Sequence, residues 1–178
     1  MAPQPLLDFL YTLPPFIANA PPVIGVSDRL QVKVVLRLDR SIKNISINPQ
    51  LLQSRLDLRA HILEAIEDAQ EFRERQVQLM ISQLARVAKL SLWDVEATLL
   101  AVKVQQTAAS LDTHCCARNR LVSVGRGQRG DIDRLVLNTM EIHDSKELER
   151  SLVDAAHRGH QKIKDLQKAW PFSELGLL

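Results

Sequence analysis

The fold is decided by the stretch SIKNISINPQLL, residues 41–52, because DIDRLVLNTMEI, residues 131–142, repeats its pattern. Both stretches alternate apolar and polar residues, as half-buried strands do, and both then enter a loop. With an offset of 90 residues, Ile42 aligns with Ile132 and Asn48 aligns with Asn138 without a gap. The repeated pattern indicates that one structural unit occurs twice in the chain.

The residues around each stretch predict the rest of the unit. In the first copy, residues 30–38 alternate as a strand that forms a hairpin with residues 42–47. A Gly- and Pro-free amphipathic stretch from about Asp57 to Leu90 then predicts a long helix. In the second copy, residues 121–125 and 132–137 predict a hairpin, and residues 144–170 predict a helix. A shorter helix over about 92–110, capped by Ser91, and an irregular segment over 111–120 are expected between the copies.

The fold class that follows is α+β, with two tandem β-hairpin-plus-long-helix units. A small hairpin with one helix buries little apolar surface, so we expect the two units to pair as an intramolecular pseudo-dimer. The expected boundaries are a Pro-rich N-terminal segment over 1–22, a first unit over 23–90, and a second unit with its preceding helix over 91–178.

Composition excludes several classes of protein. Aromatic residues make up only 4% of the chain against 46% hydrophobic residues, which predicts an aliphatic core. There is no apolar run long enough for a transmembrane helix and no basic start typical of a signal peptide. In the proline-interrupted N-terminus we expect a short helix over Leu6–Leu13 that covers a hydrophobic surface. The adjacent Cys115 and Cys116 favour a reducing compartment, either cytoplasm with its nucleoid or an organellar matrix.

Three motifs could carry chemistry, and each has a simpler interpretation. His157 and His160 could share a helix face and bind metal, but a solvated helix face is favoured because no third ligand is evident. The run 114–116, His-Cys-Cys, lacks the context that activates a thiol. The glycine-rich stretch 125–130 lacks the Lys-Ser/Thr ending of a phosphate loop and is interpreted as a hairpin turn. We therefore expect no catalytic residue, metal or cofactor, and an enzyme is the least favoured class.

Basic residues gather on both hairpins although the net charge is only +2. The larger cluster falls within seventeen positions and consists of Arg118, Arg120, Arg126, Arg129 and Arg134. The smaller cluster consists of Lys33, Arg37, Arg40 and Lys43. Such clusters are typical of salt-sensitive phosphate contacts, but they also suit an acidic protein partner or an ordinary solvated surface. These nine residues are the predicted nucleic-acid-binding site.

Residues 121–163, LVSVGRGQRGDIDRLVLNTMEIHDSKELERSLVDAAHRGHQKI, resemble the core of the YbaB/EbfC nucleoid-associated family. The shared pieces are a strand entering a Gly-containing turn, a strand of alternating aliphatic residues, an acidic loop and a helix with a Leu-Val-Ala face; residues 32–69 resemble a more diverged copy. The first copy lacks the turn glycines, and residues 115–120 replace the family's glycine-rich approach to the first strand. The resemblance implies a tweezer-like dimer whose helices project and grip nucleic acid.

Two functions are expected on these grounds. The first is non-enzymatic nucleic-acid binding, with DNA favoured over RNA, through basic hairpin edges and projecting helices. The alternative is a protein-interaction scaffold, or a subunit or assembly factor of a larger ribonucleoprotein or organellar complex, that has lost DNA binding. In that case the N-terminal segment and residues 170–172 would be docking elements. Neither function involves a membrane, and either would allow further oligomerisation.

Overall fold

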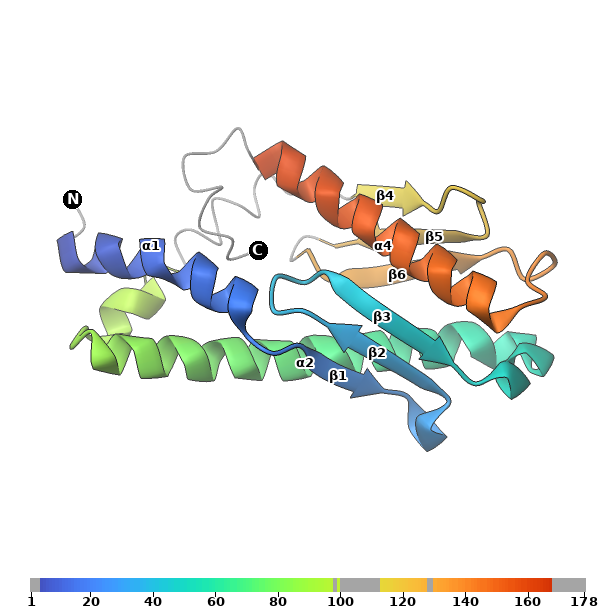
Figure 1. The fold of residues 1–178 in the computed structure, drawn as a ribbon, viewed down its shortest axis with the longest axis horizontal. Coiled ribbons are helices and arrows are strands. Elements are labelled where there is room, and N and C mark those ends of the chain that lie inside the picture. Colours follow the sequence, from blue (N-terminus) through green and yellow to red (C-terminus); the bar gives the residue numbers. More distant parts are fainter. Residues whose placement is uncertain (1–3, 98, 100–112, 128–129, 168–178) are drawn as a thin grey trace.

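The computed structural model describes residues 4–97, 99, 113–127 and 130–167 and shows an α+β protein (Figure 1). Two three-stranded antiparallel sheets have the strand orders β1-β2-β3 and β4-β5-β6. The elements of the first half are α1 (Gln4–Asn19), β1 (Val23–Val26), β2 (Val32–Leu36), β3 (Ile42–Ile47) and α2 (Arg55–Val87). Those of the second half are β4 (Thr113–Cys116), β5 (Val122–Arg126), β6 (Ile132–Leu137) and α4 (Ser145–Gln167).

Both predicted hairpins and both predicted long helices are present, but each sheet has a strand that was not predicted. β1 and β4 add an edge to the first and second hairpin respectively. β4 occupies part of the segment that was expected to be irregular, so that expectation is wrong. Residues 92–97 are helical, as expected, whereas the remainder of that predicted helix lies almost entirely outside the described residues.

The local structure of the two halves matches at the 90-residue offset. In both hairpins the register shifts at the same place, between Val35 and Leu36 in β2 and between Gly125 and Arg126 in β5. Backbone hydrogen bonds recur in the same way: Ser27 N–H to Val32 C=O matches Ala117 to Val122, and Asn48 N–H to Gln31 C=O matches Asn138 to Leu121. The register shifts and these backbone hydrogen bonds therefore recur 90 residues apart, and we call positions related by this offset equivalent.

Each long helix packs on its own sheet and on the third strand of the other sheet. α2 contacts β1, β2 and β6, and α4 contacts β4, β5 and β3 (Figure 1). The side chain of Gln70 on α2 accepts from Ile132 N–H at 2.8 Å, and the Glu149 carboxylate on α4 accepts from Ile47 N–H at 2.8 Å. One hydrophobic core contains the inner faces of both sheets and of both helices. α2 and α4 thus both contribute to one core that the two sheets share.

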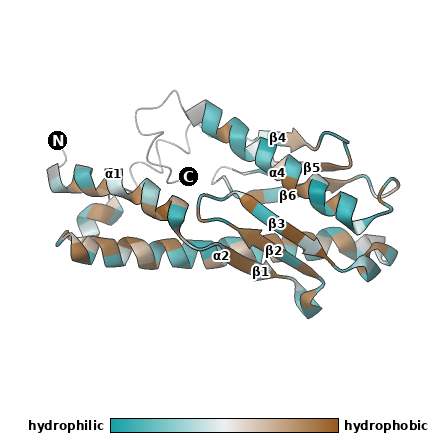
Figure 2. Cartoon of the chain, in the orientation of Figure 1, coloured by the Kyte–Doolittle hydropathy of each residue, from teal (hydrophilic) through white to brown (hydrophobic). Residues whose placement is uncertain are grey.

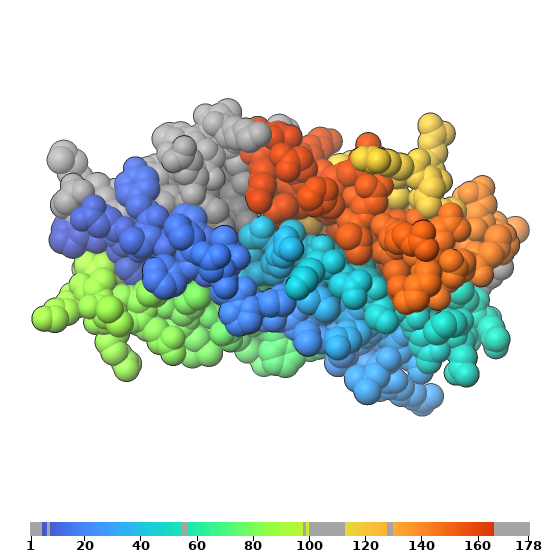
Figure 3. Space-filling view, viewed as in Figure 1, coloured from blue at the N-terminus to red at the C-terminus, as the bar shows by residue number. Residues whose placement is uncertain are grey.

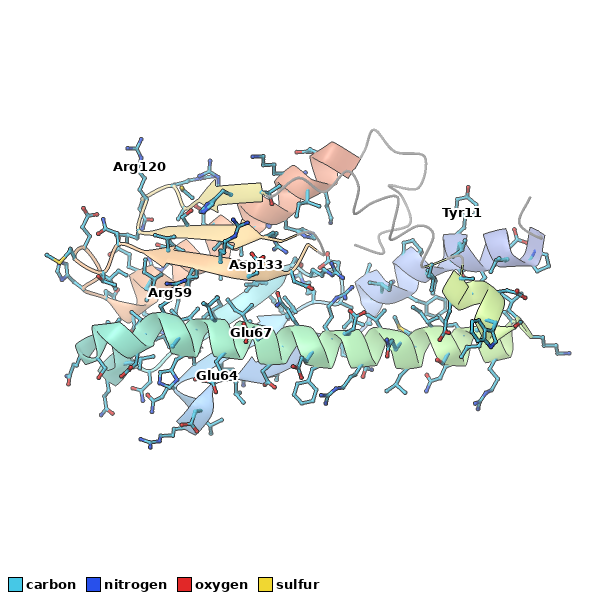
Figure 4. All side chains as sticks on the ribbon, turned by 180° about the vertical axis from the view of Figure 1, so that it is seen from behind. Tyr11, Arg59, Glu64, Glu67, Arg120 and Asp133 are labelled. Atoms are coloured by element: carbon cyan, nitrogen blue, oxygen red, sulfur yellow. The ribbon has the colours of Figure 1, made fainter. Side chains whose placement is uncertain are left out.

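This packing divides the surface into two broad faces. On one side the outer face of the first sheet lies beside α4, and on the other side the outer face of the second sheet lies beside α2 (Figures 1 and 4). Figure 2 shows that the outward side of α4 is largely hydrophilic, whereas β1 and β2 are largely hydrophobic. The exposed helix and strand residues on these two faces are the surfaces available to partners.

A second, smaller core lies at the end of α2 remote from the sheets. α1 packs there on α2 and buries Leu6, Phe9, Leu10, Leu13 and Ile17. The helix over residues 6–13 was expected to cover a hydrophobic surface, and it does, but it runs on to Asn19 through Pro14 and Pro15. Burial of Leu13 and Ile17 on either side of these prolines favours the continuation despite the lost backbone hydrogen bonds. No helix among the described residues is long and apolar enough to span a membrane.

Candidate nucleic-acid interface

The predicted basic residues separate into a buried and an exposed group. Arg40 and Arg126 are buried, with 7% and 2% of their surface exposed. The side chains of the six others are exposed, namely Lys33, Arg37, Lys43, Arg118, Arg120 and Arg134. Arg129 lies outside the described residues. Burial leaves Arg40 and Arg126 little surface for phosphate contact, whereas the six exposed residues stay predicted contacts.

Arg126 points into the protein because it alternates along β5 with the buried Val122 and Val124. Its Cα is paired with Ile132 of β6, so its side chain lies on the inner face of the sheet. There Nη1 donates to Gly130 C=O at 2.7 Å, and Nη2 donates to Ala156 C=O at 3.2 Å and to Arg40 C=O at 3.4 Å. Burial, reinforced by the charge of Arg40, lowers the pKa of Arg126 to about 10. The guanidinium therefore joins the second hairpin, α4 and the first hairpin.

Arg126 belongs to a central polar cluster that the two hairpin turns and the two long helices form together. Its members are Asp39, Arg40, Arg73, Arg126, Asp131 and His160. The Nε atom of Arg40 lies 3.7 Å from Asp131 Oδ1, which pairs the turn of one hairpin with the turn of the other. Arg73, which was not predicted, donates from Nε to Leu38 C=O at 2.8 Å, and burial lowers its pKa to about 10.

His160 is the titratable member of the central polar cluster. Burial and the nearby Arg126 lower its pKa to about 4, and Lys164 and His157 act in the same direction. The carboxylate of Asp39, 3.8 Å from His160 Nε2, opposes this shift. For Asp39 itself, burial opposes ionisation, but hydrogen bonds from Ser41 together with His160 and Lys164 outweigh burial and lower its pKa. The neutral imidazole is the form that fits this site.

We expect acid to destabilise the protein through His160. Because the folded pKa of about 4 lies below the ordinary value of 6.5, the unfolded chain binds more protons between these pH values. The contribution of His160 is therefore complete above pH 6.5 and is lost as the pH falls towards 4, by up to about 3 kcal/mol. Urea unfolding of the parent and of His160→Gln at neutral and acid pH measures this. An equally steep loss of stability with falling pH in His160→Gln would show that His160 is not the group responsible.

The exposed basic residues continue onto α4 and form what we call the basic face. Its basic members are Lys33 and Lys43 on the first sheet and Arg150, Arg158 and Lys162 on α4. A shallow depression of about 510 Å³ between β3 and α4 is lined by Lys43, Arg150 and His157, among others. A second, of about 480 Å³, is lined by His157, Arg158 and Lys162. Figure 3 shows this surface, where α4 lies beside the first sheet.

The equivalent positions on the opposite side carry, taken together, a net charge of the opposite sign. Nine positions on the basic face, counted over both sheet and helix, hold five basic residues and one acidic residue: Lys33, Lys43, Asn44, Arg150, Asp154, His157, Arg158, Gln161 and Lys162. Their equivalents hold one basic and five acidic residues: Ser123, Asp133, Arg134, Ala60, Glu64, Glu67, Asp68, Glu71 and Phe72. Figure 4 shows Glu64 and Glu67 on α2 and Asp133 on β6, and we call this surface the acidic face.

The difference in charge extends to the contacts that hold the edge strands. Asp68 of α2 accepts from Val26 N–H at 2.9 Å, at the end of β1. At the equivalent place Arg158 of α4 donates to Cys116 C=O at 2.9 Å, at the end of β4. The same structural role is thus filled by an acid in one half and by a base in the other.

Arg118 and Arg120 join the basic face at the edge formed by β4. With Arg158 they line a depression of about 520 Å³ that also includes His114 and Cys116. Arg134 does not join them, because it lies on the outer face of the second sheet, close to Asp133. Sequence reasoning missed Arg150, Arg158 and Lys162, although their spacing of four and eight positions on a predicted helix could have placed them on one side.

The sequence motifs that suggested other chemistry have structural roles. His114 Nδ1 lies 2.7 Å from Ser123 Oγ, and Cys116 Sγ lies 3.5 Å from the same oxygen, all on the outer face of the second sheet. His157 and His160 do not share an environment, because His157 is exposed and His160 is buried. Over the described ranges, no three His, Cys, Asp or Glu side chains are arranged to hold a metal ion.

No protein-family model, curated protein or solved structure matches this chain.

Proposed function

We propose that this protein binds nucleic acid through its basic face and has no enzymatic role. The observation that carries the proposal is the opposite charge of the two faces at equivalent positions. A fold with two matching sides would present the same charge twice, whereas here basic residues are concentrated on the α4 side. A face of this kind attracts a polyanion from one direction and repels it from the other.

The basic face suits the phosphate backbone rather than base edges. Its side chains are lysines and arginines on an open sheet surface and along an exposed helix, over shallow depressions. Contacts of this type position a protein on a duplex without reading its sequence. We therefore propose duplex DNA as the preferred ligand, with little preference for base sequence.

The two units are proposed to be copies of one ancestral unit, paired as a pseudo-dimer. The equivalent register shifts, backbone hydrogen bonds and helix packing support this proposal. The resemblance of residues 121–163 to the YbaB/EbfC family supports it as well and is consistent with DNA as the ligand. Duplication within one chain would explain how the two faces could diverge in charge, because a homodimer has to present identical faces.

The test compares two double variants that change the charge by the same amount. Arg150→Glu with Lys162→Glu alters the basic face, whereas Arg59→Glu with Arg75→Glu alters exposed arginines of α2. For the parent, phosphate contacts by the five basic residues on the first sheet and α4 alone predict an affinity loss of about 500-fold between about 50 and 200 mM salt. We expect Arg150→Glu with Lys162→Glu to bind DNA at least about tenfold more weakly than the parent. The slope of log affinity against log salt concentration should fall by about two.

Fluorescence anisotropy with a labelled duplex, repeated at several salt concentrations, measures both quantities. A duplex of RNA and a single strand serve as competing ligands. Equal effects of the two double variants, or an affinity that is insensitive to salt, would contradict binding through the basic face. Circular dichroism of each variant checks that the fold is retained.

The alternative of an interaction scaffold is favoured by the exposed apolar residues of the remote end. Tyr11 and Phe16 on α1, Leu79 and Val87 on α2, and Trp93 each expose more than half of their surface. Exposed aromatic and aliphatic side chains in one region are typical of protein-binding surfaces. Stoichiometric recovery of another chain on native purification, together with weak and salt-insensitive DNA binding, would favour this function over the first.

A further inference from the structure

We propose that the protein also assembles with itself, by docking the basic face of one copy on the acidic face of the next. This inference goes beyond nucleic-acid binding, because it assigns a partner to the acidic face. The partner is a second copy of this chain, and the argument rests on charge complementarity. The same molecule carries both halves of the complementary pair, on opposite sides.

The charges decide which pairs of faces can meet. Contact between two basic faces would place Lys43, Arg150 and Lys162 of one copy opposite the same residues of another. Contact between two acidic faces would bring Glu64, Glu67 and Glu71 together in the same way. Both closed, two-fold arrangements are therefore repulsive, whereas a basic face against an acidic face is attractive.

The surfaces also match in form, because both consist of the outer face of a sheet beside a long helix. On the basic face, the depression between β3 and α4 is lined by three bases, Lys43, Lys146 and Arg150, with His157. Its two carboxylates are already engaged: Glu149 pairs with Lys146, and Asp154 accepts from Arg118 N–H. On the acidic face, Glu64 and Glu67 lie on the exposed side of α2 (Figure 4). Among the described side chains, neither glutamate has a close arginine or lysine partner; Glu64 contacts His61, at 3.4 Å. We infer that these two glutamates enter the depression of the neighbouring copy.

A contact between two different faces does not close on itself. Each added copy leaves one basic and one acidic face free at the ends of the assembly, so the association continues head to tail. Because exposed ion pairs are individually weak and are screened by salt, we expect a reversible assembly that forms at low salt and high protein concentration. Nucleic acid would occupy the same basic face and would therefore compete with assembly.

The experiment uses two charge-reversed variants of the full chain. Over the nine positions, Glu64→Lys with Glu67→Lys takes the net charge of the acidic face from −4 to 0, and Lys43→Glu with Arg150→Glu takes that of the basic face from +4 to 0. Sedimentation velocity at about 50 mM and about 500 mM salt measures their size. We expect the parent to shift to larger species at the lower salt, each variant alone to stay monomeric, and an equimolar mixture of the two variants to assemble again. Recovery in the mixture shows that the variants are folded and that charge complementarity is the cause.

The outcomes separate this inference from the proposed function. A monomeric parent at low salt, parent-like assembly of the variants, or failure of the mixture to assemble would each overturn the inference. DNA affinity is measured in parallel on the same samples. The Glu64→Lys, Glu67→Lys variant is expected to bind duplex DNA at least as tightly as the parent. If Lys43→Glu with Arg150→Glu prevents assembly without weakening DNA binding, the inference stands and the proposed nucleic-acid interface fails.

Discussion

Replacing Arg126 with methionine is expected to destabilise the protein by about 3 to 5 kcal/mol, the cost typical of breaking a buried charge network. The guanidinium donates to carbonyl oxygens of Gly130, Arg40 and Ala156, which lie on three different segments. Methionine fills a similar volume but leaves these oxygens without their donor and removes a positive charge that faces Asp131 and Asp39. Urea-induced unfolding followed by circular dichroism gives the difference in free energy.

Arg118→Met is the matched control, because the same substitution there removes a largely exposed side chain from the β4 edge. It should change the free energy of unfolding by no more than about 0.5 kcal/mol. DNA binding should instead respond to the substitution of Arg118. The dependence of log affinity on log salt concentration should keep the parent's slope in folded Arg126→Met, whereas Arg118→Met should reduce that slope by about one. A loss of less than about 1 kcal/mol for Arg126→Met would show that the central polar cluster does not hold the two halves together.

Strong local periodicity explains the parts of the fold that were predictable. Alternation over residues 32–36 and 42–47 required one buried face, and the Gly- and Pro-free stretch over 57–87 required a helix. β1 and β4 have only four residues each, with Gly25 inside the first and polar side chains in the second. Such short segments become strands because they pair with the edge of a hairpin and pack on a helix. These tertiary contacts cannot be predicted from the local sequence.

The sequence identified the basic residues of the site, but counting charges did not show which way each side chain points. Counting charges located the basic hairpins but took no account of strand alternation, which places Arg126 on the inner face with Val122 and Val124. The register shift in each hairpin leaves one extra residue on the last strand of that sheet. This residue is Lys43 in β3 and Asp133 in β6, and both are exposed. The opposite net charge of the two faces could not be predicted, because only the tertiary structure shows that α2 and α4 lie on opposite sides of the molecule.

The largest steric effect is expected at Gly25, where β1 crosses α2. A Cβ atom at this position would overlap the backbone nitrogen of Ala69 and the carbonyl oxygen of Ala65, and it would lie 2.6 Å from the Ala69 Cβ. Backbone atoms within a helix cannot move aside as a flexible side chain can, so the strand would have to leave the helix. We expect Gly25→Ala to cost more than about 3 kcal/mol, which is at the upper end of overpacking effects.

The equivalent crossing in the second half solves the same packing problem differently and provides the control. There the strand residue is Cys115 and the helix residue is Gly159, so the small residue is on the helix. A Cβ at Gly159 would meet Arg126 Nε at 3.5 Å and Cys115 Cβ at 3.8 Å, both ordinary contacts. Because alanine favours a helix over glycine by about 1 kcal/mol, Gly159→Ala should be neutral or stabilising. Thermal unfolding of Gly25→Ala and Gly159→Ala tests this. Similar losses of stability in the two variants would show that the strand lies equally close to the helix at both sites, contrary to the distances in the structure.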